Sequence, residues 1–170
     1  MVEKIKKLLS SKVLKNGIWL TILQLVNTVI PVITIPYVTR ILGTNEYGIF
    51  SIALNWILYL QVLVEYGFGL SGSRKVALLK ENSHKELNGL FNNIISARII
   101  LLIFSFVILN LICVLSSFNM QTYLSMLILF TMIFGTTFQL TWLFQGKQDM
   151  KFITIINVIS RVVSVILIFM

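Results

Sequence analysis

Long apolar runs separated by short polar segments dominate the pattern of this chain. A helix rises about 1.5 Å per residue, so roughly 20 apolar residues are needed to cross about 30 Å of hydrocarbon. The uncharged run at residues 16–39 meets this requirement once. Residues 47–64 form a second run that continues past Glu65 to Leu70, and another begins near Phe152 and runs to Met170.

The longest uncharged run, residues 99–146, is too long for one membrane span. As a single helix it would extend about 72 Å, more than twice the hydrocarbon core, so it must fold back on itself. The only polar cluster near its middle lies at residues 116–122, where we expect the turn. The pattern thus predicts an all-α polytopic transmembrane helix bundle with four full spans and a fifth, truncated one, at about 16–39, 47–70, 99–117, 121–144 and 152–170.

We expect residues 1–170 to form a single transmembrane domain, because no repeat, low-complexity tract or soluble domain interrupts the runs. The fifth span ends without a basic anchor, an aromatic belt or a polar tail. That ending indicates a fragment or a truncated open reading frame.

Composition agrees with a membrane environment. The chain has 170 residues, of which 57% are hydrophobic and 12% charged. A soluble domain carries about 25% charged residues, and a chain this apolar cannot cover its surface with polar groups. The formal charge of +8 is explained by basic loops between spans, and no aromatic and basic residues alternate on a polar domain, so we expect no nucleic-acid partner.

The distribution of lysine and arginine predicts the orientation. The N-terminal tail has five, the segment from Ser71 to Arg98 has five, and residues 146–151 have two. The loop after the first span has only Arg40, and the turn after the third has none. Alternate sides thus hold twelve cations against one, which predicts that the N-terminal tail and the segment from Ser71 to Arg98 are cytoplasmic.

Polar residues within the spans mark one side of the first two helices. Gln24 and Asn27 share an arc of about 140° with Thr21, Thr28, Pro31 and Thr34. In the second span, Ser51, Asn55 and Tyr59 are spaced four apart, with Glu65 on the same side. Two interpretations remain open: hydrogen bonds between helices, worth about 0.6 kcal/mol each, or a hydrated cavity.

Two charged residues within the spans distinguish better between these two interpretations than the neutral polar residues do. Arg161 lies ten residues into the fifth span, close to the predicted middle of the bilayer, where a charge costs at least about 2.5 kcal/mol. Glu65 lies near the cytoplasmic end of its span, from where its carboxylate can reach water. An ion pair between Glu65 and Arg161 is compatible with the sequence but is not required by it.

Pro31 and Pro36 stand five residues apart in the outer half of the first span. Each lacks a backbone donor and clashes with the carbonyl four residues earlier, so we expect them to bend or break the helix. Interrupted helices beside a polar cavity are typical of a transporter's substrate path, although structural kinking alone is the alternative.

The sequence offers no support for enzyme chemistry. It contains no nucleophile and base pair, no metal-ligand spacing and no phosphate-binding glycine loop, so we expect no catalytic residue, metal or cofactor. Cys113 is the single cysteine and lies in an apolar run. His84 is the single histidine, and its polar neighbours indicate a solvated loop residue.

Three motifs resemble one known family, the bacterial polysaccharide-biosynthesis membrane proteins that include O-antigen and capsule repeat-unit flippases. The signature Q…P…PY..R.LG…YG is matched by Gln24, Pro31, Pro36-Tyr37, Arg40-Ile41-Leu42-Gly43 and Tyr47-Gly48. The stretch GF..S..RK is matched by Gly67-Phe68, Ser71 and Arg74-Lys75, and WLFQG by residues 142–146. These motifs follow in order and cover nearly the whole chain.

The resemblance implies a multidrug/oligosaccharidyl-lipid/polysaccharide exporter fold, with about twelve or more helices in two lobes around a central cavity. This chain would supply the first four helices and most of a fifth, and would need the remaining helices as partners. The implied cargo is an undecaprenyl-diphosphate-linked oligosaccharide, flipped between leaflets. Arg40 and Arg161 would attract its diphosphate, and Gln24, Asn27 and Asn55 would line the sugar path.

Two alternatives remain. A cation-coupled drug or lipid-II exporter of the same superfamily would need a membrane carboxylate, for which Glu65 is the candidate. A non-transporting membrane fragment or interaction subunit would need none of these residues. For a flippase, the polymerase and ligase of the same pathway are further possible partners, beside the lipid bilayer itself.

Overall fold

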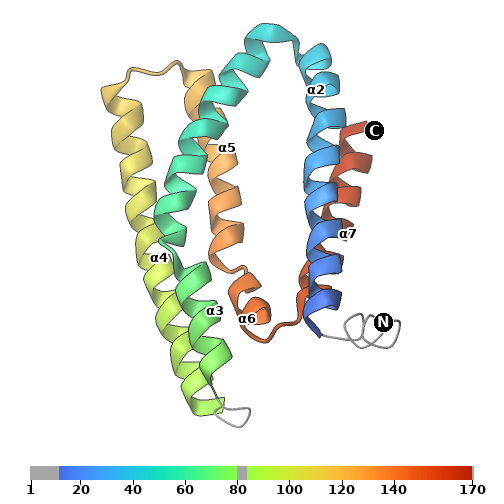
Figure 1. Ribbon diagram of the computed structural model, residues 1–170. Coiled ribbons are helices and arrows are strands. Elements are labelled where there is room, and N and C mark those ends of the chain that lie inside the picture. The colour runs from blue at the N-terminus through green and yellow to red at the C-terminus, as the bar shows by residue number, and fades with distance from the viewer. Residues whose placement is uncertain (1–11, 80–83, 170) are drawn as a thin grey trace.

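The computed structural model describes residues 12–79 and 84–169, and every element within them is an α-helix. The helices are α2 (Lys12–Glu65), α3 (Phe68–Leu78), α4 (His84–Leu115), α5 (Met120–Thr137), α6 (Thr141–Gly146) and α7 (Met150–Phe169) (Figure 1). Four helical stretches in these residues are long and apolar enough to cross a membrane: Leu14–Leu78, His84–Leu115, Met120–Gly146 and Met150–Phe169. The predicted all-α transmembrane bundle is therefore confirmed.

The first stretch contains two spans, because α2 is two helices joined at Gly43. The chain rises along one side of the molecule, turns at the top and descends on the other (Figure 1). Gly43 has φ 78° and ψ 167°, a combination open essentially only to glycine. The motif glycine of R.LG therefore makes the turn between the first two spans.

Pro31 and Pro36 do not interrupt the first span. Both lie inside α2, and the residue with non-helical backbone angles in this helix is Gly43. A break at the prolines, one of the two effects expected from the sequence, is therefore absent. Each proline still removes one backbone donor from the helix.

The predicted second span, residues 47–70, is shorter than expected. The helix ends at Glu65, and Tyr66 and Gly67 both have positive φ, at 38° and 76°. A new helix, α3, then begins at Phe68, and the Ser71 hydroxyl donates to the Gly67 carbonyl at 3.1 Å. The second family motif, GF..S..RK, thus forms this turn and the first part of α3.

The predicted loop from Ser71 to Arg98 is largely helical. It comprises most of α3 and the first half of α4, and His84 is the first residue of α4 rather than a loop residue. The sequence missed these helices because their polar surface resembles a loop in hydropathy. Lys80 of this segment, and Lys4, Lys6 and Lys7 of the basic tail, lie outside the described residues.

The long uncharged run folds back where expected, but its second half is not one helix. The turn after α4 ends at Asn119, whose side-chain oxygen accepts from the Met120 backbone N–H at 3.1 Å and caps α5. The predicted fourth span, 121–144, is broken at residues 138–140, between α5 and α6. The fifth span corresponds to α7.

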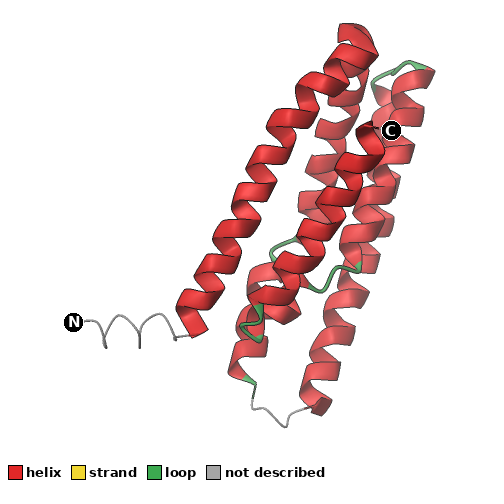
Figure 2. Ribbon diagram, turned by 90° about the vertical axis from the view of Figure 1, so that its right-hand side faces the viewer, coloured by secondary structure: helices red, strands yellow, loops and turns green. Residues whose placement is uncertain are grey.

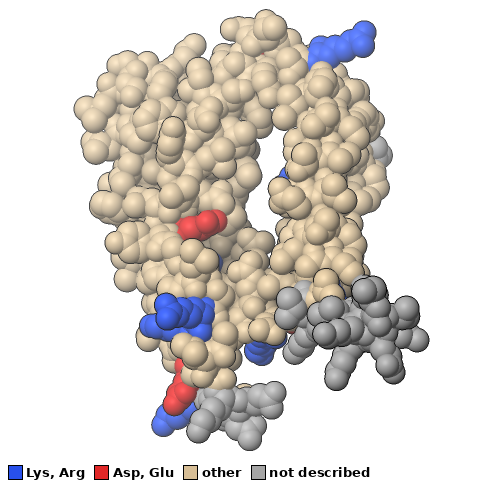
Figure 3. All heavy atoms as spheres, in the orientation of Figure 1, with Lys and Arg blue, Asp and Glu red and all other residues tan. Residues whose placement is uncertain are grey.

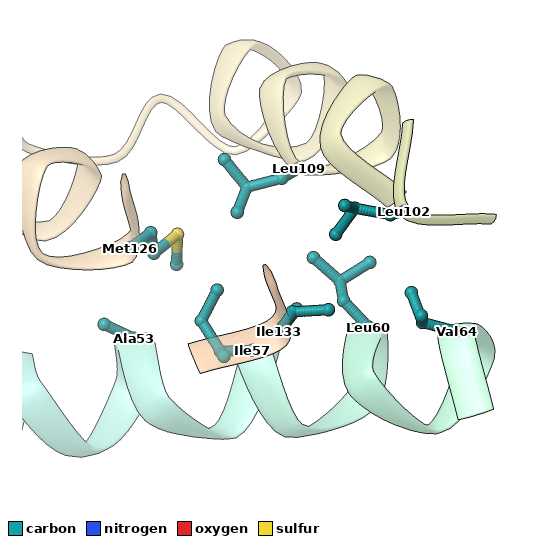
Figure 4. Close-up of a cluster of buried hydrophobic side chains, with 8 residues drawn as sticks. All are labelled: Ala53, Ile57, Leu60, Val64, Leu102, Leu109, Met126 and Ile133. Carbon is teal, nitrogen blue, oxygen red and sulfur yellow. The ribbon is translucent and has the colours of Figure 1, made fainter. Parts of the chain in front are cut away.

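The helices pack as two groups. The second half of α2 packs with α4 and α5 around a core of eight buried apolar side chains (Figure 4): Ala53, Ile57, Leu60, Val64, Leu102, Leu109, Met126 and Ile133. The first half of α2 packs with α7, where the Thr154 hydroxyl donates to the Trp19 carbonyl at 3.1 Å and the Tyr37 and Phe169 rings lie 4.3 Å apart. Figure 1 shows this pair beside the group formed by the second half of α2, α4 and α5, and Figure 2 shows the pair in front of that group.

The ends of the bundle differ in charge. The turn at Gly43 and the turn after α4 lie at one end, and α3, α6 and the start of α7 lie toward the other (Figure 1). Lys and Arg side chains gather at the second end, whereas Figure 3 shows a single basic group at the first. The described helices therefore separate the basic segments as the charge count predicted. Which end faces the cytoplasm stays a prediction.

Candidate functional site

A cavity of about 320 Å³ lies where the two groups of helices meet near α6. Its wall takes residues from both halves of α2 and from α3 to α7, so it exists only because the groups come together here. The lining residues are Leu20, Leu23, Glu65, Gly69, Arg98, Thr136, Gln139, Thr141, Trp142, Gln145, Ile153 and Asn157.

Arg98 is the best-anchored polar residue of the cavity. It projects from α4, and its side chain is only 5% exposed. Its Nη1 donates to the carbonyls of Thr136, Thr137 and Gln139 at 3.4, 3.3 and 3.2 Å. Carbonyls at a helix C-terminus lack partners within the helix and carry partial negative charge, so a guanidinium is well placed there. Arg98 therefore holds the break between α5 and α6.

Two buried N–H donors at the cavity wall have no hydrogen-bond partner, namely Arg98 Nε and Trp142 Nε1. Trp142 is only 1% exposed and packs against Val76 and Ile94. An unpaired buried donor costs about 1–3 kcal/mol, so such groups call for an explanation. Both atoms are covered by protein, so a ligand reaches them only after side chains move.

The accessible polar part of the lining consists mainly of carboxamides. Gln139 and Gln145 are exposed, and their side-chain amides bond to no other described residue. Asn157 is half-buried, and its Nδ2 donates to the Ile153 carbonyl at 2.8 Å, which leaves its oxygen free to accept. Carboxamides offer both donors and acceptors without charge. This lining suits a neutral, hydroxyl-rich ligand.

The charges of the lining balance each other. Glu65 and Arg98 are its only charged residues, and the Glu65 carboxylate interacts electrostatically with the guanidinium. The carboxylate also accepts a hydrogen bond from Gln61 Nε2 at 3.0 Å. Only Nη1 of the guanidinium is bound to carbonyls, so the balance of one anion against one cation, and not the loss of every donor, is what makes this lining a weak site for a bare anion.

Of the residues predicted from sequence for the substrate path, only Glu65 lines this cavity. Arg161 and Arg40 are exposed, on α7 and before the Gly43 turn, and Glu65 and Arg161 form no ion pair. Gln24, Asn27 and Asn55 lie elsewhere on α2, and Asn55 Nδ2 donates to the Ser51 carbonyl of its own helix at 2.9 Å. The structure thus brings none of these five to the cavity, and their roles stay predictions.

Sequence reasoning missed Arg98, Gln139, Gln145 and Asn157. Arg98 was counted only as a loop cation, because it borders the uncharged run. A usable signal was the third motif, WLFQG, which contains Trp142 and Gln145 and lies in α6.

Comparisons with known proteins agree with the family resemblance of the three sequence motifs. The profile of a family described as "Polysaccharide biosynthesis protein" matches residues 13–170. A relative from Escherichia coli (strain K12), named "Putative O-antigen transporter", is 30% identical over 91% of this chain and 37% of its own length. A relative from Shigella dysenteriae with the same name is 29% identical over 91% of the chain and 38% of its own length.

The chain therefore spans less than two fifths of the length of these curated relatives. No solved structure matches it. The family profile covers nearly the whole chain, and the three sequence motifs coincide with turns and helices that build the bundle. The chain belongs to the polysaccharide biosynthesis protein family.

Proposed function

We propose that this chain forms part of a flippase that moves undecaprenyl-diphosphate-linked oligosaccharide repeat units across the cytoplasmic membrane during O-antigen or capsule biosynthesis. The observation that carries the proposal is a polar, charge-balanced cavity between two groups of helices in a bundle apolar enough to span a membrane. The names of the two relatives agree with an export role. The activity is transport rather than enzyme catalysis, and it requires no cofactor.

The cavity lining supports the sugar rather than the diphosphate as its occupant. Gln139, Gln145 and Asn157 can exchange hydrogen bonds with hydroxyl groups, and the flanking leucines and Ile153 supply apolar contact. Arg98 Nη1 donates to backbone carbonyls, its Nε is covered by protein, and Glu65 offsets its charge. The diphosphate therefore needs other cations, and the exposed Arg40 and Arg161 remain our candidates, with Gln24, Asn27 and Asn55 along the sugar path.

The remaining helices of the full-length transporter would complete the cavity, with residues 1–170 acting as one transmembrane domain. The N-terminus would face the cytoplasm, and the α6 end of the cavity would then receive cargo from that side. Polymerase and ligase of the same pathway would act on the flipped product.

The decisive experiment replaces Gln139 and Gln145 together by Ala in the full natural polypeptide. Surface display of polysaccharide in cells lacking the native flippase measures transport. We expect display to fall by roughly tenfold, because two hydrogen bonds to cargo, together worth about 1–3 kcal/mol, are lost. Asn92→Ala, an exposed amide on α4 outside the cavity, serves as the matched control. Unchanged display with normal protein levels would refute a role for this cavity in cargo binding.

Arg161→Ala in the same assay examines the predicted attraction of the diphosphate. Reduced display supports the assignment, whereas wild-type display would show that this cation does not capture cargo.

A second candidate function, a cation-coupled drug or lipid-II exporter, is favoured by one observation: Glu65 is the carboxylate of the cavity. Glu65→Gln would then abolish drug resistance and leave glycan assembly intact. The reverse result would support the flippase.

A further inference from the structure

One face of α3 combines exposed leucines with basic side chains. We call it the α3 outer patch and define it as Leu70, Arg74, Lys75 and Leu78. Leu70 is 84% exposed and Leu78 is 76% exposed, and Arg74 and Lys75 are exposed between them. On a helix, Leu70, Arg74 and Leu78 lie one turn apart on the same side.

The opposite face of α3 is held firmly in the protein, which fixes the direction of the patch. Gly72 and Val76 are buried, at about 120–160° from Leu70, Arg74 and Leu78 when each residue turns the helix by about 100°, and Lys75 lies at the edge between the two faces. A Cβ on Gly72 would lie 2.9 Å from the Trp142 ring, and one on Gly146 of α6 would lie 2.5 Å from Val76 Cβ. The patch must therefore point away from the bundle.

The depth of α3 follows from the length of the helix before it. The second half of α2, residues 44–65, has 22 residues and a length of about 33 Å, close to the 30 Å of hydrocarbon. Because α3 begins three residues after Glu65, its first turns lie at the level of the lipid headgroups. Leucines there reach acyl chains, and long basic side chains reach phosphates.

Charge at this site favours an anionic lipid. The described residues of α3 and the first turn of α4 contain Arg74, Lys75 and Lys85 against Glu86 alone. Lys75 and Leu78 also line a groove of about 440 Å³ between the two helices, and because Glu86 lines this groove as well, we place the phosphate at its outer edge, toward Arg74. Figure 3 shows basic side chains gathered at this end of the molecule.

We propose that the α3 outer patch binds an anionic phospholipid, with its phosphate on Arg74 and Lys75 and its acyl chain against Leu70. This site lies outside the transport cavity and does not depend on the cargo. Bound lipid would hold α3, and through Gly72 and Trp142 the wall of the cavity, at a fixed depth in the membrane.

The test is native mass spectrometry of the full natural polypeptide in detergent, titrated with phosphatidylglycerol or with phosphatidylcholine of the same acyl chains. Each basic residue near a membrane surface is worth about 1 kcal/mol toward anionic lipid. Replacing Arg74 and Lys75 by Gln should therefore weaken phosphatidylglycerol binding by roughly 5- to 30-fold and leave phosphatidylcholine binding unchanged.

The matched control is Lys147→Gln with Lys151→Gln, which removes the same charge from exposed positions near the same end of the bundle. It should change phosphatidylglycerol binding by about twofold or less. A charge-conserving pair, Arg74→Lys with Lys75→Arg, should retain binding and guards against a folding defect.

Three outcomes would overturn the proposal. Equal losses in the patch and control variants would show general attraction to charge, and loss of both lipids would show that phosphate is not recognised. A second protein chain that dissociates only in the patch variant, while lipid stays bound, would assign the patch to a protein partner.

Discussion

At the scale of single residues, Arg98 links three parts of the molecule, because it extends from α4 to the carbonyls that end α5 and borders the cavity. Arg98→Ala would leave the buried Thr137 carbonyl and the partly buried Gln139 carbonyl without this donor, which costs about 1–3 kcal/mol, whereas the Thr136 carbonyl keeps the Gln139 backbone N–H. We therefore expect a lower free energy of unfolding, measured by denaturant titration in detergent micelles.

Lys151→Ala is the matched control, since this lysine is exposed and its removal leaves no buried acceptor. Equal destabilisation by the two substitutions would contradict the anchoring role of Arg98.

The buried, anchoring role of Arg98 could not be predicted from the sequence. A cation bordering an uncharged run is typical of the positive-inside pattern, and that pattern counts it as a loop residue. Arg98 is buried because α5 ends opposite it. This contact joins residues far apart in the sequence, so the spacing of residues around Arg98 does not reveal it. For Arg161, in contrast, the sequence located the charge within a span correctly, but the described helices leave it exposed rather than paired.

At the scale of elements, α6 and α3 approach so closely that the motif glycine of WLFQG has no room for a side chain. A Cβ on Gly146 would lie 2.5 Å from Val76 Cβ and 2.7 Å from the Ser73 carbonyl oxygen. Gly146→Ala should therefore push the two helices apart and lower the free energy of unfolding by about 1–3 kcal/mol.

Gly89→Ala supplies the comparison, because a Cβ there meets no atom within 4 Å. It should be neutral or stabilise α4 by up to about 1 kcal/mol, since alanine favours helix more than glycine does. The same loss at both positions would mean that contact with α3 is not what Gly146 provides.

Substitutions at the Gly43 turn and at the prolines of the first span should affect the free energy of unfolding differently. Gly43→Ala forces alanine into backbone angles that cost about 1–3 kcal/mol, so the free energy of unfolding should fall by that amount. Pro31→Ala restores a backbone donor in a continuous helix and should cause no loss. Thermal unfolding followed by circular dichroism compares the two, and a larger loss for Pro31→Ala would restore the proline-based interpretation.

Hydropathy located the apolar segments because a helix that crosses the membrane needs a minimum number of consecutive apolar residues. It could not find the break at residues 138–140, since both sides of the break are uncharged. It also missed α3, whose exposed arginine and lysine resemble a loop. Short helices held by tertiary contact, such as α6, leave no length signal at all.

At the scale of the whole molecule, the alternation of basic and neutral segments predicts a single orientation. The Gly43 turn and the turn after α4 share one end of the bundle, with Arg40 the cation closest to the first of them. Lys75 and Lys147 belong to segments toward the other end. Because basic segments stay in the cytoplasm, the two turns should face outward.

Cysteine labelling in intact bacterial cells tests this orientation, in a Cys113→Ser background that removes the native thiol. Asn45→Cys and Ser116→Cys, both exposed at the turns, should react with a membrane-impermeant maleimide added outside. Lys75→Cys and Lys147→Cys should react only after the membrane is permeabilised. The reverse pattern would invert the topology, and the α6 end of the cavity would then open away from the compartment in which lipid-linked cargo is proposed to enter.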